Sequence, residues 1–129
     1  MSFVVTVNTR EFDTSTRQMK FVSDTYVRDA QTYESVYRDV VDMYWDTNKL
    51  VSVYVRHTDA HLPTMFVVER LYWDVSCERY FVESVSLRGA QSYDEVQRDV
   101  ESVARTGKKI YLIRPATTQE CEMYDFLNW

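Results

Sequence analysis

The sequence predicts an α+β fold, a two-layer sandwich of six strands and two helices built from a tandem β-β-α-β duplication with a pseudo-twofold axis. The first observation is an internal repeat: residues 28–40 and 88–100 are identical at eight of thirteen aligned positions, against roughly one in twenty by chance. The second is that two segments with the alternation of strands precede each copy and a third follows it. Together they predict the order strand, strand, helix, strand, occurring twice.

The repeat also defines the domain organisation. We expect one domain over residues 1–129, made of unit one (about 1–60), unit two (about 61–116) and an acidic and aromatic C-terminal tail (117–129). A unit of ~60 residues buries only a modest share of its surface and would be marginally stable alone. The two units are therefore predicted to share a core.

Six segments rich in β-branched and aromatic residues read as strands. Residues 3–10 and 19–28 form a hairpin around the turn composition of Asp13 to Thr16, since such side chains bond to nearby backbone. Residues 65–74 and 79–88 form the second hairpin. Residues 50–56 and 109–114 are the third strand of each unit.

The segment between each hairpin and its third strand has apolar residues at helical spacing. Thr32 and Ser92 lie where an N-cap belongs, and Ser92 with Glu95 has the spacing of a capping box. Residues 47–48 and Gly107 supply C-terminal stop signals. We expect both helices on one face of the sheet. The apolar positions are Tyr33, Val36, Val40 and Met43 in unit one, and Tyr93, Val96, Val100 and Val103 in unit two.

Composition narrows the function classes. The net charge of −5 argues against binding to a nucleic-acid backbone at large, which normally needs a basic excess. No segment approaches the ~20 apolar residues of a membrane span, and no signal sequence is recognisable, so we expect a cytoplasmic protein without membrane contact. Cys77 and Cys121 lack metal-type spacing and are interpreted as free thiols.

His57, Asp59 and His61 form the one cluster suited to metal binding or acid–base chemistry. Three donors without a fourth ligand are weak evidence for a metal, so a solvated loop is the favoured interpretation. The sequence contains no Walker loop, dinucleotide fingerprint, serine nucleophile elbow or zinc-protease motif. We therefore expect no catalytic residue, no metal and no cofactor, and a protein that is not an enzyme.

The two helices differ on their outer faces. Where unit two has Gln97, Glu101 and Arg105, typical of a solvated face, unit one has an apolar stripe that another segment or a partner must cover. The aromatic tail could cover it within the chain, and a partner or second subunit is the alternative. The predicted interface residues are Tyr37, Val41 and Trp45 of the stripe and Tyr124, Phe126 and Trp129 of the tail.

The strands carry apolar residues on both faces, such as Leu50 with Val51 and Ile110 with Tyr111. A two-layer sandwich leaves its outer sheet face polar, so a second subunit is expected to cover that face, giving a homodimer or higher oligomer. A strongly curled sheet that packs on itself is the alternative.

Four arginines form a candidate anion-binding set, Arg28, Arg56, Arg88 and Arg114, because they end the strands that flank the helix N-termini. The favoured explanation is structural, with Arg28 and Arg88 paired to acids such as Asp39 and Asp99.

We predict a small protein–protein interaction module, homo-oligomeric, that binds another macromolecule, a profile also compatible with a small viral inhibitor. The alternative is a nucleotide or nucleic-acid binder that uses these arginines, with strand tyrosines stacking on bases.

Overall fold

The computed structural model describes residues 1–44, 47–59, 61–74, 76–104 and 109–127. Unit one contains β1 (Ser2–Asp13), β2 (Gln18–Asp29), α1 (Tyr33–Tyr44) and β3 (Leu50–His57). Unit two contains β4 (Met65–Asp74), β5 (Arg79–Gly89), α2 (Tyr93–Val103) and β6 (Lys109–Pro115), and α3 (Thr118–Leu127) follows. The predicted order of strands and helices is confirmed, in an α+β fold. Within the described ranges, no helix is long and apolar enough to cross a membrane.

All six strands form one mixed sheet in the order β2-β1-β3-β6-β4-β5. Each unit contributes three adjacent strands, with its first strand between the other two. The units meet where β3 and β6 pair in parallel, from Ser52 with Tyr111 to Tyr54 with Ile113. Exchanging each element of unit one for its counterpart in unit two reproduces this strand order.

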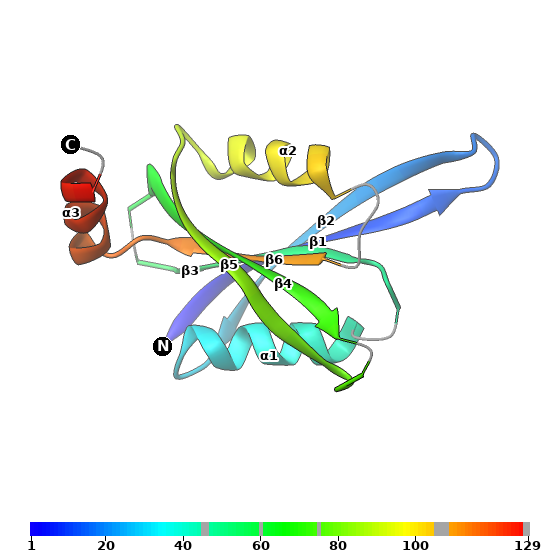
Figure 1. The fold of residues 1–129 in the computed structure, drawn as a ribbon, viewed down its shortest axis with the longest axis horizontal. Coiled ribbons are helices and arrows are strands. Elements are labelled where there is room, and N and C mark those ends of the chain that lie inside the picture. The colour runs from blue at the N-terminus through cyan, green and yellow to red at the C-terminus, as the bar shows by residue number, and fades with distance from the viewer. Residues whose placement is uncertain (45–46, 60, 75, 105–108, 128–129) are drawn as a thin grey trace.

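The two helices lie on opposite faces of the sheet (Figure 1). Val36 and Val40 of α1 pack with Val53 and Val55 of β3, whereas Val96 of α2 belongs to a second core cluster on the other side. The layers are therefore helix, sheet and helix, and the prediction of two layers with both helices on one face was wrong. The reason is the parallel pairing of β3 with β6: equivalent parallel strands are related by an axis along the strands, and rotation about that axis turns the second unit over.

This arrangement explains the apolar residues on both faces of the central strands. In β3, Leu50 and Val53 face the α1 cluster and Val51 and Tyr54 face the α2 cluster, and all four are buried. A strand that is covered on both faces reads as a continuous apolar run. The chain's own helices thus cover the surfaces for which the sequence predicted a second subunit.

The two hairpins turn in the same way. Asp13 Oδ1 accepts hydrogen bonds from the backbone N–H and the hydroxyl of Ser15, at 2.9 and 2.6 Å. Asp74 accepts the same pair from Ser76 at the same distances. These bonds lower the pKa of both aspartates, with the side-chain bond as the largest cause. The predicted turn chemistry is confirmed.

The helix caps agree with prediction in part. Thr32 Oγ1 accepts from the backbone N–H of Ser35 at 3.2 Å, as an N-cap does. Ser92 makes no side-chain cap bond, and Glu95 instead accepts from the N–H of Gln91 at 2.6 Å. Asn48 adopts the left-handed conformation (φ 57°) that suits a chain turn, four residues after α1 ends at Tyr44. Gly107 lies outside the described residues.

The tail forms a helix that the sequence interpretation missed. Thr117 Oγ1 accepts from the backbone N–H of Glu120 at 3.1 Å, and Glu120 accepts from the N–H of Thr117 at 2.9 Å. This is a capping box, so the signal was present as Thr-x-x-Glu. Figure 1 shows α3 beyond the carboxyl end of β6.

Candidate binding groove

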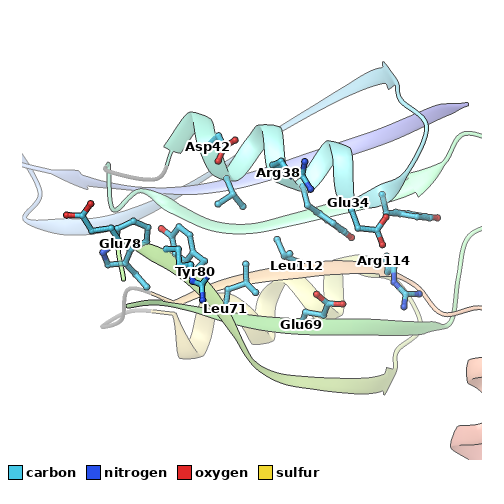
Figure 2. Close-up of a pocket in the computed structure, with 14 residues that line it drawn as sticks. Glu34, Arg38, Asp42, Glu69, Leu71, Glu78, Tyr80, Leu112 and Arg114 are labelled. Atoms are coloured by element: carbon cyan, nitrogen blue, oxygen red, sulfur yellow. The ribbon is translucent and has the colours of Figure 1, made fainter. Parts of the chain in front are cut away.

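An open groove of about 550 Å³ lies between α1 and the sheet of unit two. One wall comes from the outer face of α1, and the floor and opposite wall come from β4, β5 and β6 (Figure 2). The groove thus lies across the two units. Its lining residues are Tyr33, Glu34, Tyr37, Arg38, Val41, Asp42, Glu69, Leu71, Trp73, Glu78, Arg79, Tyr80, Leu112 and Arg114.

The floor is apolar and aromatic. Leu71 and Leu112 are buried members of the α1 core cluster, and Tyr80 packs against the same cluster. Trp73 stacks edge-on with Tyr80, with ring centroids 4.9 Å apart. Pockets that bind small molecules or protein side chains are usually lined in this way, because apolar area supplies affinity.

The rim carries charge of both signs with an acidic excess. Figure 2 shows Glu34 and Arg114 at one end of the groove and Asp42 and Glu78 at the other. Arg114 is neutralised by a carboxylate outside the groove, described below, and four acidic side chains then face two remaining arginines. The acidic residues are Glu34, Asp42, Glu69 and Glu78, and the remaining arginines are Arg38 and Arg79.

On the other face, hydrogen bonds span the space beside the middle of α2, at the positions equivalent to the centre of the groove. Glu101 of α2 accepts from Nδ2 of Asn8 on β1 at 3.1 Å, and Gln97 donates to the hydroxyl of Ser23 on β2 at 2.9 Å. Gln97 also donates to Glu101 at 3.1 Å. Of the three residues predicted to form a solvated face, Gln97 and Glu101 are instead partly buried by these contacts, and Arg105 lies outside the described residues. Unit two thus fastens its helix to the sheet at the positions where unit one leaves a groove.

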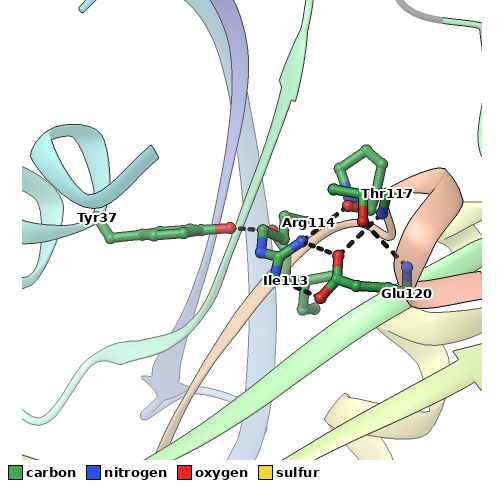
Figure 3. A network of polar contacts seen from close by, with 6 residues as sticks. Tyr37, Ile113, Arg114, Thr117 and Glu120 are labelled. Atoms are coloured by element: carbon green, nitrogen blue, oxygen red, sulfur yellow. Dashed lines mark hydrogen bonds and ion pairs between the residues drawn. The ribbon is translucent and has the colours of Figure 1, made fainter. Parts of the chain in front are cut away.

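The predicted interface residues that the structure describes differ in exposure and in their contacts. Val41 lines the groove. Tyr37 is 8% exposed and its hydroxyl donates to the backbone carbonyl of Ile113 (Figure 3), so most of this ring is covered within the chain. Burial raises the pKa of Tyr37 well above 10. Trp45, Trp129 and the side chains of Tyr124 and Phe126 lie outside the described residues.

Sequence reasoning missed the opposite wall of the groove. Leu71, Trp73, Tyr80 and Leu112 come from unit two, and they face α1 only because β6 and β4 follow β3 in the sheet. A single sequence does not encode that strand order locally. The available signal was the difference between the helices, which identified one wall alone.

Three of the four candidate anion-binding arginines are paired within the chain. Arg28 forms an ion pair with Asp39, and Arg88 forms the equivalent pair with Asp99. These are the pairs that the structural explanation names. Arg114 makes a two-pronged contact with Glu120 of α3, at 2.7 and 2.8 Å (Figure 3).

The contact between Arg114 and Glu120 shifts the pKa values of both side chains. Hydrogen bonds from Arg114 lower the pKa of Glu120 to about 2, and the backbone N–H of Thr117 acts in the same direction. The same contact raises the pKa of Arg114. Both side chains are about one quarter exposed. This pair attaches α3 to the end of β6.

The side chains of the predicted cluster His57, Asp59 and His61 do not come together as a metal site. The ring of His57 packs against Phe3 at 4.6 Å and Tyr33 at 5.2 Å between centroids, so it belongs to the aromatic core beside α1. In the described part of the chain, no group of three His, Cys, Asp or Glu side chains has the geometry to hold a metal ion.

Cys77 and Cys121 are free thiols. The strand tyrosines differ in exposure: Tyr54 and Tyr111 are buried, whereas Tyr26 and Tyr72 are partly exposed.

The chain matches no protein-family model, no curated protein and no solved structure.

Proposed function

We propose that this protein is a binding module that engages another protein through the groove between α1 and the sheet of unit two. The observation that carries this proposal is the contrast between the two faces. Hydrogen bonds of Asn8, Gln97 and Glu101 close the space beside the middle of α2, whereas the equivalent space beside α1 is open and apolar, within a groove of about 550 Å³. Aromatic and aliphatic pockets of this kind accept the anchor side chains of a partner.

The lining chemistry supports binding rather than catalysis. The described lining residues include no histidine, cysteine, serine or threonine, and the proton-carrying groups among them are carboxylates and tyrosines, which serve equally well as hydrogen-bonding and charged contacts for a partner. The acidic excess of the rim favours a partner segment that combines an apolar or aromatic anchor with basic residues, because complementary charge speeds encounter and selects partners.

We also infer that the chain arose by tandem duplication and that unit one later acquired the groove. The matching hairpin turns, the paired arginines and the symmetric strand order support the duplication. Homo-oligomerisation remains a separate expectation from the sequence, and the groove proposal does not depend on it. Size-exclusion chromatography with light scattering measures it directly.

The proposal is tested by selecting peptides from a random phage-displayed library on the immobilised protein. We expect the recovered peptides to carry an aromatic or aliphatic anchor beside basic residues, and to shift the NMR signals of Trp73, Tyr80 and Val41. Val41→Glu places at this position the residue type found in unit two and should weaken peptide binding at least about tenfold, the equivalent of 1.4 kcal/mol.

Met43→Glu is the matched control, because Met43 is on the same helix, is 67% exposed and does not line the groove. It should leave peptide binding unchanged. Peptides that bind Val41→Glu as tightly as the parent protein, or that map to another surface, would overturn the proposal.

A further inference from the structure

A second pocket, of about 290 Å³, lies on the other face of the sheet at the N-terminus of α2. Its walls come from β1, β2, the end of β3, the segment before β4 and the first turn of α2. None of these residues lines the groove beside α1. The lining residues are Val4, Thr6, Thr25, Tyr54, Arg56, Leu62, Pro63, Gln91, Ser92, Tyr93 and Asp94.

Arg56 in this pocket is the structural counterpart of Arg114. Two residues after Arg56, the backbone N–H of Thr58 donates to the carbonyl of Ser2 at the start of β1. Two residues after Arg114, the backbone N–H of Ala116 donates to the carbonyl of Met65 at the start of β4. Each arginine therefore occupies the same place in its unit.

The two guanidinium groups also have the same local geometry. Nη1 of Arg56 donates to the carbonyl of the next residue, His57, at 3.4 Å. Nη1 of Arg114 donates to the carbonyl of the next residue, Pro115, at 3.2 Å. Each arginine is beside the N-terminus of the other unit's helix. What Arg114 binds is thus a guide to what Arg56 can bind.

Arg114 binds a carboxylate with both prongs, from Glu120, which is six residues further along the chain. The residue six positions after Arg56 is Leu62, which is 79% exposed and lines the second pocket. Among the described residues, Arg56 forms no ion pair. Unit one therefore has the equivalent arginine, Arg56, but Leu62 stands where unit two has the carboxylate that pairs with Arg114.

An acidic residue on the first turn of α2 does not argue against an anion here. Asp94 lines the second pocket, and its counterpart Glu34 on α1 lines the groove beside Arg114. Arg114 nevertheless binds Glu120. The equivalent acid is therefore compatible with a carboxylate on the arginine.

The aromatic wall of the pocket provides a second observation. Tyr54 is 4% exposed and its hydroxyl has no hydrogen-bond partner among the described residues. Its ring stacks on Tyr93, with centroids 4.1 Å apart and planes 13° apart. Buried hydroxyls are usually paired, so an unpaired one on the wall of a pocket marks a place where a polar group is expected.

We propose that this pocket binds a carboxylate carried by an apolar group from outside the chain, with Arg56 as the two-pronged donor and the stacked tyrosines and Leu62 against the apolar part. Guanidinium and carboxylate match in geometry, which makes such contacts strong and orientation-specific. The carboxylate belongs either to a small organic acid or to an acidic side chain of a protein. This site is independent of the groove beside α1.

The test uses NMR titration of the full chain with 3-phenylpropionate and with a terminally blocked tripeptide of phenylalanine, glutamate and phenylalanine. We expect at least one acid to shift the side-chain signal of Arg56 and the amide signals of residues 91–94. The uncharged 3-phenylpropionamide and inorganic phosphate should bind at least about tenfold more weakly, since charge and planar geometry both contribute. Tighter binding of the tripeptide assigns the site to a protein partner, and tighter binding of the small acid assigns it to a metabolite.

Two variants complete the test. Arg56→Gln should lose the response to the acids, whereas Arg38→Gln, which changes an arginine on the other face, should keep it. Leu62→Glu supplies the missing carboxylate within the chain, so it should block the acids and raise the melting temperature, and Arg56→Gln should cancel that rise. Phosphate binding as tight as the acids, no response to either acid, or unchanged acid binding in Leu62→Glu would each overturn the assignment.

Discussion

The hydroxyl of Tyr37 on α1 donates a hydrogen bond to the backbone carbonyl of Ile113 on β6, which ties the helix of unit one to a strand of unit two. Removing this hydroxyl deletes one buried hydrogen bond between the two units. We therefore expect Tyr37→Phe to lower the free energy of unfolding by about 1–3 kcal/mol, measured by urea denaturation. Tyr72→Phe, at a side chain that is 38% exposed, should change it by less than about 0.5 kcal/mol. Equal effects of the two substitutions would contradict the assigned hydrogen bond.

Alkaline pH should act on the same tyrosines. Burial raises the pKa of Tyr37 well above 10 and that of Tyr54 to about 12. A tyrosine whose pKa is raised by folding stabilises the fold below the unfolded value near 10, and this contribution is lost as pH rises through the folded value. Stability should therefore fall between about pH 10 and pH 12. Absorbance titration at the tyrosinate wavelength and unfolding curves across this range test it, and ionisation of all ten tyrosines near pH 10 in the folded protein would refute it.

The hydrogen bond between Asn8 and Glu101 should give a measurable coupling energy between these two residues. Glu101 accepts from the fully buried Asn8 at 3.1 Å. Truncating either residue removes the same bond, so a double-mutant cycle of Asn8→Ala and Glu101→Ala should show a coupling energy of about 0.5–3 kcal/mol. Glu101→Gln retains an acceptor and should cost less than Glu101→Ala. Additive effects in the cycle would show that the bond contributes nothing.

Arg10 should be among the most sensitive positions in the chain. It is 7% exposed, and it donates to the carbonyl of Ala104 at the C-cap of α2 at 2.5 Å and to the carbonyl of Asn48 at 3.2 Å. Burial lowers its pKa. Arg10→Met retains the length of the side chain but leaves both carbonyls without this donor, and we expect a loss of about 2–4 kcal/mol. Chemical denaturation measures the loss, with the exposed Arg98→Met as control.

Acid should release α3 before it unfolds the sheet. The pKa of Glu120 is lowered from 4.5 to about 2, chiefly by its bonds to Arg114. A carboxylate whose pKa is lowered by folding contributes its stabilisation above the unfolded value, and the contribution is lost as pH falls from 4.5 toward 2. Hydrogen exchange of the amides of residues 118–123 should increase in that window. Glu120→Gln should remove the pH dependence, and a helix equally protected at pH 2 and pH 6 would exclude the attachment.

Local structure was readable from the sequence because local chemistry determines it. The Asp13 and Asp74 turns and the left-handed conformation of Asn48 all depend on bonds or backbone angles within a few residues. The pairing of Arg28 with Asp39 also follows from two adjacent elements. Such features recur in both units because each unit needs them to fold.

The placement of the helices was not readable, because it depends on which strands meet at the centre of the sheet. The continuous apolar run of β3 indicates that both of its faces are buried, but it does not indicate whether a helix of the same chain or a second subunit covers them. The opposite wall of the groove, with Trp73 and Tyr80, depends on the same pairing. The sequence shows that Val41 and Glu101 differ at equivalent positions, but it does not show that Glu101 bonds to Asn8.

The junction of the two units has a consequence for engineering the chain. Residues 58–64 connect them covalently, yet the β3–β6 pairing, the Tyr37 bond to Ile113 and the packing of Leu71 and Leu112 with the α1 cluster join them without this connection. Cutting the peptide chain within residues 58–64 should therefore yield two fragments that reassemble when mixed. The same break could serve as new termini for a circular permutant, since chain continuity at this place adds little to the contacts that the halves already make.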